Sequence, residues 1–166
     1  MQVLYLEIQQ VIDNARAISG YRSGTETGHG EQNPAPSINI EDNALSKKLL
    51  EDGAAEVAGI MSGYFKGLAG KDSKGPEGFE FDADYEGKEG CIVYRLNMPP
   101  SYDARLNSPL KRAVRSALEN FILFRFSDMV NSDSGKYEGS YRKELGKIRS
   151  YLSRRTETIK RTYKLY

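Results

Sequence analysis

The chain has 166 residues, of which 39% are hydrophobic and 28% charged, and its formal net charge is +1. This length predicts one domain with a single core, and the composition is typical of a soluble globular protein rather than a disordered one. No apolar stretch approaches the roughly 20 residues of a membrane-spanning helix, so we expect no contact with a membrane. A single cysteine, Cys91, excludes an intramolecular disulfide framework and favours a reducing cytoplasm. The N-terminal stretch lacks the features of a secretory signal.

The charge is unevenly distributed along the chain. Residues 142–166 contain nine Lys or Arg and two Glu, a balance of +7. Residues 1–141 carry fifteen basic and twenty-one acidic side chains, a balance of −6. A molecule with an acidic body and a basic C-terminal end can attract further copies of itself, or can present the basic end to an acidic partner.

The N-terminal residues are predicted to form an amphipathic helix from Val3 to Ile18, which Gly20 would stop. Apolar side chains recur there every three or four residues, at Leu4, Ile8, Val11, Ala15 and Ile18. Residues 20–37 are rich in Gly, Pro, Ser and Thr and nearly devoid of apolar side chains. This composition predicts a long mobile loop, and a loop of this length is often functional or becomes ordered by a partner.

A second helix is predicted from about Glu41 to Leu68, with Asp42 as its N-cap. Small residues occupy every fourth position of its second half: Ala55, Gly59, Gly63 and Gly67. Each interior glycine costs roughly 0.8–1 kcal/mol relative to Ala, so the repeat needs a reason. Close packing inside the domain, fraying of the helix end and contact with another subunit remain open. For a subunit contact, the candidates are Gly59, Gly63 and Gly67.

Residues 78–98 show the alternation of a β-hairpin, with a Gly-containing turn at 87–90. The apolar positions are Phe79, Phe81, Ala83, Tyr85, Ile92, Tyr94, Leu96 and Met98, and the first strand carries the acids Glu80, Asp82, Asp84 and Glu86. An isolated hairpin is marginally stable in water, so we expect it to pack on the helices or to pair with another chain.

Two C-terminal helices are predicted. The first would begin at Pro109 and becomes apolar nearly all round at residues 121–126. Since a surface helix shows only an apolar stripe, we interpret this segment as partly core and partly subunit interface, with Phe124 and Phe126 in the interface. After a short loop, the last helix would span residues 137–155.

No catalytic, cofactor-binding or metal-binding residue is predicted. The single histidine, His29, lies in the Gly-rich loop without a carboxylate or thiol at motif spacing, which favours a surface histidine over a catalytic base. Cys91 is most simply a small buried residue, and one His with one Cys cannot supply a structural zinc site. Four carboxylates that alternate along one strand form a solvated face rather than a calcium-binding loop. We therefore expect no enzyme.

The C-terminal segment combines cations with tyrosines: Tyr151, Arg154, Arg155, Lys160, Arg161, Tyr163, Lys164 and Tyr166, with Glu157 as its one carboxylate. Such a segment could bind phosphates and stack on bases, or simply be a helix end whose cations favour the helix dipole. It could also be an arm that docks on an acidic protein surface with tyrosines as anchors. The acidic body favours this third interpretation. We expect residues 156–166 to form the arm, which would contact its partner through Arg154, Arg155, Lys160, Arg161, Tyr163, Lys164 and Tyr166.

The order of the predicted elements resembles the small head–tail connector (adaptor) proteins of tailed bacteriophages and prophages. This order is a helix, a loop, a long helix, a hairpin and two C-terminal helices, and the stretch "RAVRSALENFILFRFSDMVNSDSGKYEGSYRKELGKIRSYLSRR" carries the resemblance further. The resemblance covers residues 109–155 best and the remaining chain loosely. It implies a ring of mainly helical subunits beneath the portal, in which loops and C-terminal arms clasp neighbours or the portal.

The resemblance implies a mainly α fold, with about four helices in a bundle and one β-hairpin insertion, in a single domain over residues 1–155. The implied function is structural: a virion protein at the head–tail junction, assembled in the host cytoplasm, that links portal and tail while DNA passes through the ring. Its implied partners are further copies of itself, the portal protein and the next tail or neck protein, with no cofactor. A small nucleic-acid-binding accessory protein that uses the basic C-terminal tail is the alternative.

Overall fold

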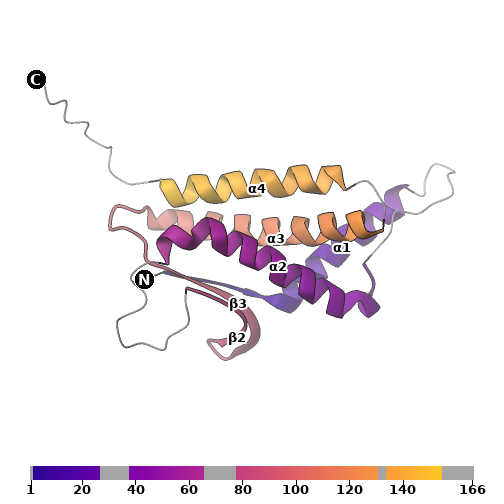
Figure 1. The fold of residues 1–166 in the computed structure, drawn as a ribbon, viewed down its shortest axis with the longest axis horizontal. Helices are drawn as coiled ribbons and strands as arrows, with labels where there is room; N and C mark the ends of the chain where they lie inside the picture. Colours follow the sequence, from indigo (N-terminus) through magenta and orange to yellow (C-terminus); the bar gives the residue numbers. More distant parts are fainter. Residues whose placement is uncertain (1, 27–37, 66–77, 131–133, 155–166) are drawn as a thin grey trace, which may run out of the picture.

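A computed structural model describes residues 2–26, 38–65, 78–130 and 134–154, which contain four α-helices and a three-stranded antiparallel sheet (Figure 1). In chain order these elements are β1 (Gln2–Glu7), α1 (Ile8–Glu26), α2 (Asn43–Met61), β2 (Phe79–Tyr85), β3 (Lys88–Leu96), α3 (Asn107–Met129) and α4 (Gly135–Ser153). Short 3-10 turns lie at η1 (Ile40–Asp42), η2 (Ser62–Tyr64) and η3 (Ala104–Leu106). The predicted mainly α fold with a β-hairpin is confirmed, and the sheet has one strand more than predicted.

The additional strand, β1, corrects the predicted N-terminal helix. It pairs antiparallel with β3, in a register that sets Leu6 opposite Ile92. Leu4 and Leu6 are 3% and 2% exposed, whereas the residues between and beside them are half-buried, which is the period of two of a strand. Leu4 and Ile8 also fit helical spacing, and this coincidence explains the wrong prediction.

Helix α1 continues past Gly20 and ends at Glu26, so the predicted stop at this glycine is wrong. A single glycine in a helix interior costs only about 1 kcal/mol, which the adjoining helical turns can offset. Residues 20–26, predicted to belong to the loop over residues 20–37, are therefore part of α1. Residues 27–37, including His29, lie outside the described residues.

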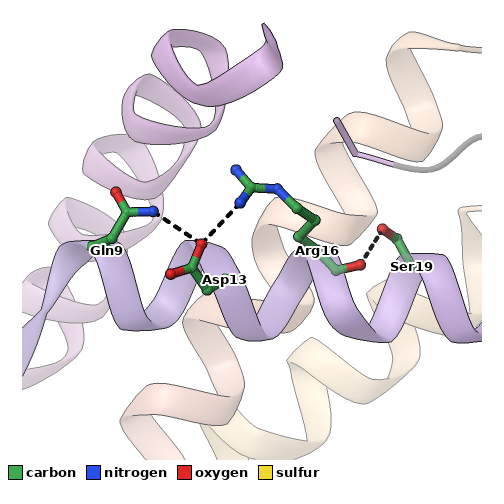
Figure 2. A network of polar contacts seen from close by, with 4 residues as sticks. All are labelled: Gln9, Asp13, Arg16 and Ser19. Atoms are coloured by element: carbon green, nitrogen blue, oxygen red, sulfur yellow. Dashed lines mark hydrogen bonds and ion pairs between the residues drawn. The ribbon is translucent and has the colours of Figure 1, made fainter. Parts of the chain in front are cut away.

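Polar contacts join side chains and backbone groups along α1 (Figure 2). The amide of Gln9 and the guanidinium of Arg16 each donate to Oδ1 of Asp13 at 2.9 Å. The hydroxyl of Ser19 donates to the carbonyl of Arg16 at 2.8 Å. The same hydroxyl accepts a hydrogen bond from the backbone N–H of Ile38 at 3.1 Å. Ser19 is 5% exposed, so its hydroxyl satisfies a backbone group where the chain rejoins the core.

Helix α2 is shorter than the predicted helix over residues 41–68, because it ends at Met61 and is followed by the 3-10 turn η2. Residues 66–68 lie outside the described residues. Asp42 occupies the N-cap position, as predicted, but its side chain does not cap α2. Its carboxylate instead accepts a hydrogen bond from the N–H of Asn39 at 2.9 Å, which stabilises the turn before the helix.

The predicted hairpin is formed by β2 and β3. Its tight turn is at Glu86 and Gly87, with φ angles of 51° and 76°, and positive φ at both central positions is typical of a type I′ turn. The register shifts beside Asp82, whose φ of 58° marks a bulge in β2. Strand β1 of the same chain pairs with the other edge of β3, which gives the order β1-β3-β2. The hairpin is therefore stabilised within one chain, both by this strand and by the helices.

Helix α3 lies at the centre of the molecule, where it packs against α4, α2, α1 and β1 (Figure 1). This position explains why residues 121–126 are apolar nearly all round. Phe121, Ile122 and Phe126 are 6%, 1% and 8% exposed, and only Phe124 of the segment's aromatic residues is half-buried. Elements of the same chain on several sides of α3 therefore cover most of this segment.

The helices of the described part of the chain are too short or too polar to cross a bilayer. Their apolar faces instead meet the inner face of the sheet in one cluster. The largest fully buried side chains of this core are Tyr94, Leu6, Ile12, Ile38, Leu50, Met61, Ile92, Leu96, Leu110, Leu118, Ile122 and Leu123.

Candidate assembly surface

The small residues of α2 and η2 lie on an exposed face. Ala55, Gly59 and Gly63 are all exposed, and a Cβ added at Gly59 or Gly63 would meet no neighbouring atom of the described residues within 4 Å. Close packing within the described part of the chain therefore does not explain these two glycines. Gly67, the third glycine of the predicted contact, lies outside the described residues.

The glycine that internal packing does require is Gly53, which the sequence analysis missed. It is buried, and a Cβ there would lie 2.7 Å from Cδ1 of Phe121. The signal that could have found it is its position between Leu49 and Val57, on the apolar face of α2. Helix α2 thus uses Gly53 for packing against α3, whereas Gly59 lies where another molecule can approach.

An open groove of about 570 Å³ lies beside Gly59, between the C-terminal ends of α2 and α4. It is lined by Glu56, Gly59 and Ile60 of α2, by Tyr64 of η2, and by Leu145, Arg149 and Leu152 of α4. The two leucines are 8% and 2% exposed, so they form an apolar floor that is part of the core. Its volume falls in the range of ligand pockets, but its place between two helix ends suits a peptide segment or an aromatic side chain.

Opposite charges stand on the two walls of this groove. Glu56 lies on α2 and Arg149 lies on α4, and both residues are exposed. The charges of both act on the hydroxyl of Tyr141. Burial raises the pKa of Tyr141 well above its ordinary value, Glu56 raises it further, and Arg149 lowers it. The groove therefore combines an apolar floor with one hydrogen-bond acceptor, the carboxylate of Glu56, and one donor, the guanidinium of Arg149. A segment that contains both basic and aromatic side chains can bind to such a surface.

One end of the groove is fixed by hydrogen bonds. The hydroxyl of Tyr64 donates to the carbonyl of Leu152 at 3.0 Å, and the carbonyl of Tyr64 accepts a hydrogen bond from the N–H of Asn97 at 2.7 Å. These bonds connect the turn after α2 to the last turn of α4 and to the chain beyond β3. The groove consequently has a defined shape at the point where α4 ends.

The predicted docking segment begins at this same end. Arg154 follows α4 with extended φ and ψ of −70° and 140°, is exposed, and places its guanidinium carbon 5.8 Å from the ring centroid of Tyr151. The remaining predicted docking residues lie outside the described residues: Arg155, Lys160, Arg161, Tyr163, Lys164 and Tyr166. The predicted arm, residues 156–166, starts four residues after Leu152.

The predicted interface aromatics of α3 contact other residues of the same chain. The ring of Phe124 lies edge-on to Phe121 at a centroid distance of 6.4 Å, and Phe121 packs against Tyr141 of α4 at 5.2 Å. Phe126 is buried, so little of its surface is available to another subunit. Large exposed apolar side chains lie instead where α3 ends, at Met129, its last residue, and at Val130 after it, which are 58% and 42% exposed.

Two acids of β2 form ion pairs. Glu80 accepts a hydrogen bond from Arg95 within the sheet, and Asp82 forms an ion pair with Lys47 of α2 at 2.7 Å. Within the described ranges, no three His, Cys, Asp or Glu side chains cluster in a way that could hold a metal ion. Cys91 is buried, and burial raises the pKa of its thiol. The two ion pairs join β2 to β3 and to α2.

No protein-family model, no curated protein and no solved structure matches the chain. The features that bear on function are therefore the groove between α2 and α4, the exposed glycines beside it and the order of the elements.

Proposed function

We propose that the protein is a structural subunit of a bacteriophage head–tail connector, which assembles into a ring and links the portal protein to the next tail or neck protein. DNA passes through the ring. The order of the elements supports this proposal through its resemblance to the connector family. The protein acts by binding its neighbours, and it carries out no chemical reaction.

The observation that carries the proposal is the exposed glycine at position 59 beside the groove. A glycine within a helix costs roughly 0.8–1 kcal/mol, and no packing among the described residues offsets this cost at Gly59. A residue without a side chain lets another backbone approach the helix closely. Together with the apolar floor formed by Leu145 and Leu152, it provides a contact surface for a neighbouring protein.

The charge distribution supports assembly rather than binding of nucleic acid by the body. Residues 1–141 carry a balance of −6, so the body repels phosphates, and an acidic lumen lets DNA slide without adhering. The basic residues 142–166 complement the acidic body of a neighbour or of the portal.

Light scattering at rising protein concentration, alone and with a portal protein, tests the proposal. We expect assembly into discrete rings that are visible by electron microscopy. Gly59→Leu should raise the concentration at half-assembly by about tenfold or more, since it fills the contact surface and tenfold corresponds to about 1.4 kcal/mol.

The matched control is Gly139→Leu on α4, which is equally exposed and has no neighbour within 4 Å among the described residues. This variant should fold and assemble like the unaltered chain. A chain that stays monomeric at all concentrations, with and without portal protein, contradicts the proposal. Submicromolar binding of duplex DNA by such a monomer would favour the nucleic-acid-binding alternative.

A further inference from the structure

We propose that, before assembly, residues 155–166 fold back into the groove between α2 and α4 of their own chain. The groove has an apolar floor, one carboxylate and one guanidinium, and it opens beside the end of α4, where this segment begins. The inference rests on the proposed function, because it describes how the free subunit covers a surface that the assembled ring uses.

The distance that the segment must cover is short. The groove residues Leu145 and Leu152 are two helical turns apart, which corresponds to about 10 Å along α4. Twelve extended residues reach at most about 40 Å, so the segment can reverse its direction and still run the length of the groove. Arg154 already has extended backbone angles, and a chain reversal can follow directly.

The residue types of the segment match those of the groove. Tyr163 and Tyr166 supply aromatic rings for the apolar floor beside Gly59, where no side chain stands in the way. The cations of the segment suit Glu56 and the exposed Asp52 one turn earlier on α2. Its one acid, Glu157, suits Arg149 on the opposite wall.

The same chain is favoured over a second copy as the source of the segment. Because the segment begins three residues after Leu152, its effective concentration at the groove is on the order of millimolar, without the entropy cost of bringing two molecules together. At low protein concentration the groove is therefore occupied by the segment of its own chain rather than by that of a second copy. In the ring, where a neighbour or the portal competes at close range, the segment leaves the groove and exposes Gly59 for contact.

Disulfide trapping in the full-length chain tests this inference. Gly59→Cys is combined with Thr162→Cys, and formation of the disulfide is followed in a redox buffer by mass spectrometry under non-reducing conditions. The native Cys91 is buried and serves as an unreactive background thiol. We expect the pair to close within one chain, at a rate that does not depend on protein concentration.

The matched control is Gly146→Cys with Thr162→Cys. Gly146 is exposed on α4, has no neighbour within 4 Å among the described residues, and does not line the groove. Gly146 is as close to the end of α4 as the groove is. Random motion of the segment should therefore bring residue 162 to Gly146 as often as to the groove. The groove pair should close at least about tenfold faster than this control pair. Adding Glu56→Lys to the groove pair should remove most of this difference.

Equal rates for the two pairs would overturn the inference. Disulfides that form only between chains, at a rate that rises with concentration, would also overturn it and would assign the groove to a second copy. Ring formation and portal binding are measured separately on the reduced protein. A chain that forms rings without the intramolecular disulfide contradicts this inference alone, whereas a chain that closes the disulfide but never assembles contradicts the proposed function alone.

Discussion

Single residues of α2 show how one residue type serves two purposes. Gly53 is buried against Phe121, with no room for a Cβ, whereas Gly59 is exposed with open space around it. The same substitution therefore has opposite effects at two positions six residues apart. This contrast separates a glycine needed for folding from one that is free to serve an interaction.

Gly53→Ala should destabilise the fold by about 1–3 kcal/mol, because its Cβ forces the ring of Phe121 to move within a packed core. Gly59→Ala, the matched control, should stabilise the fold by up to about 1 kcal/mol through helix propensity alone. Urea denaturation of both variants measures these changes. Equal effects of the two substitutions would contradict the packing of α2 against α3.

Glu119 is a second residue whose surroundings predict a measurable effect. Its carboxylate accepts a hydrogen bond from the side-chain amide of Asn14 at 2.8 Å, between α3 and α1. Burial raises the pKa of Glu119 above its ordinary value of 4.5, although the hydrogen bond from Asn14 and the charge of Arg115 lower it in part. Because the folded pKa exceeds the unfolded one, the ionised carboxylate reduces stability above the folded pKa. This cost disappears as the pH falls towards 4.5.

Glu119→Gln keeps an oxygen for Asn14 and removes the charge. We expect the variant to be more stable than the unaltered chain at pH 7, by on the order of 0.5 kcal/mol after allowance for solvent screening. The difference should shrink as the pH approaches 4. Free energies of unfolding at pH 7 and pH 4 measure it, and a variant that is less stable than the unaltered chain at pH 7 would be the contrary result.

At the scale of the elements, the helices and the hairpin can be predicted from local sequence patterns, whereas strand β1 is harder to predict. The apolar spacing of α2, α3 and α4 and the turn between β2 and β3 are local signals, and the predicted elements match the structure apart from their ends. Strand β1 is different, since its partner β3 is distant in the chain and the spacing of Leu4 and Ile8 imitates a helix. The alternation of Leu4 and Leu6 is a short local signal, and the pairing of β1 with β3 adds none.

Only part of the candidate site, its exposed glycines, can be predicted from the sequence. The repeat of Gly59 and Gly63 can be recognised from spacing, and both are exposed as a contact surface requires. The groove itself arises from the relative position of α2 and α4, which their separate sequences do not encode locally. The burial of Phe126 depends likewise on how many elements surround α3.

Leu6→Ala distinguishes the strand from the predicted helix. In β1 the side chain of Leu6 is 2% exposed, so its truncation should cost about 2–5 kcal/mol. In a helix whose apolar face contains Leu4 and Ile8, Leu6 would lie on the opposite face and the cost would be small. Thermal unfolding measures the change, with the exposed Gln10→Ala as control. A negligible effect of Leu6→Ala would contradict the strand.

At the scale of the whole molecule, the acidic body and basic C-terminal end predict how the chain meets its partners. Deletion of residues 156–166 should leave the helical fold intact, since the described core does not include them, and should abolish attachment to portal-bearing heads. Circular dichroism and co-sedimentation with heads measure these two outcomes. Attachment that survives the deletion would show that the arm is not the docking segment.

Two point substitutions separate a protein partner from DNA. If the arm docks on a protein, Tyr163→Ala should weaken binding by about 2 kcal/mol. Arg161→Ala should then cost about 0–1 kcal/mol. If phosphates are the target, the cations dominate, and affinity for DNA falls with salt by a log–log slope of about 0.9 per phosphate contact. We expect only weak binding of duplex DNA at physiological salt.

The pairing of β1 with β3 also has a consequence for folding during synthesis of the chain. Gln2 meets Leu96 across about ninety residues, so the sheet has a high contact order. During synthesis β1 leaves the ribosome first and must wait until more than half of the chain has been translated before its partner strand emerges. Until then Leu4 and Leu6 have no sheet to join, and the nascent strand presents an unpaired edge to its surroundings. Newly made chains are therefore most prone to mispair during translation, before β3 emerges.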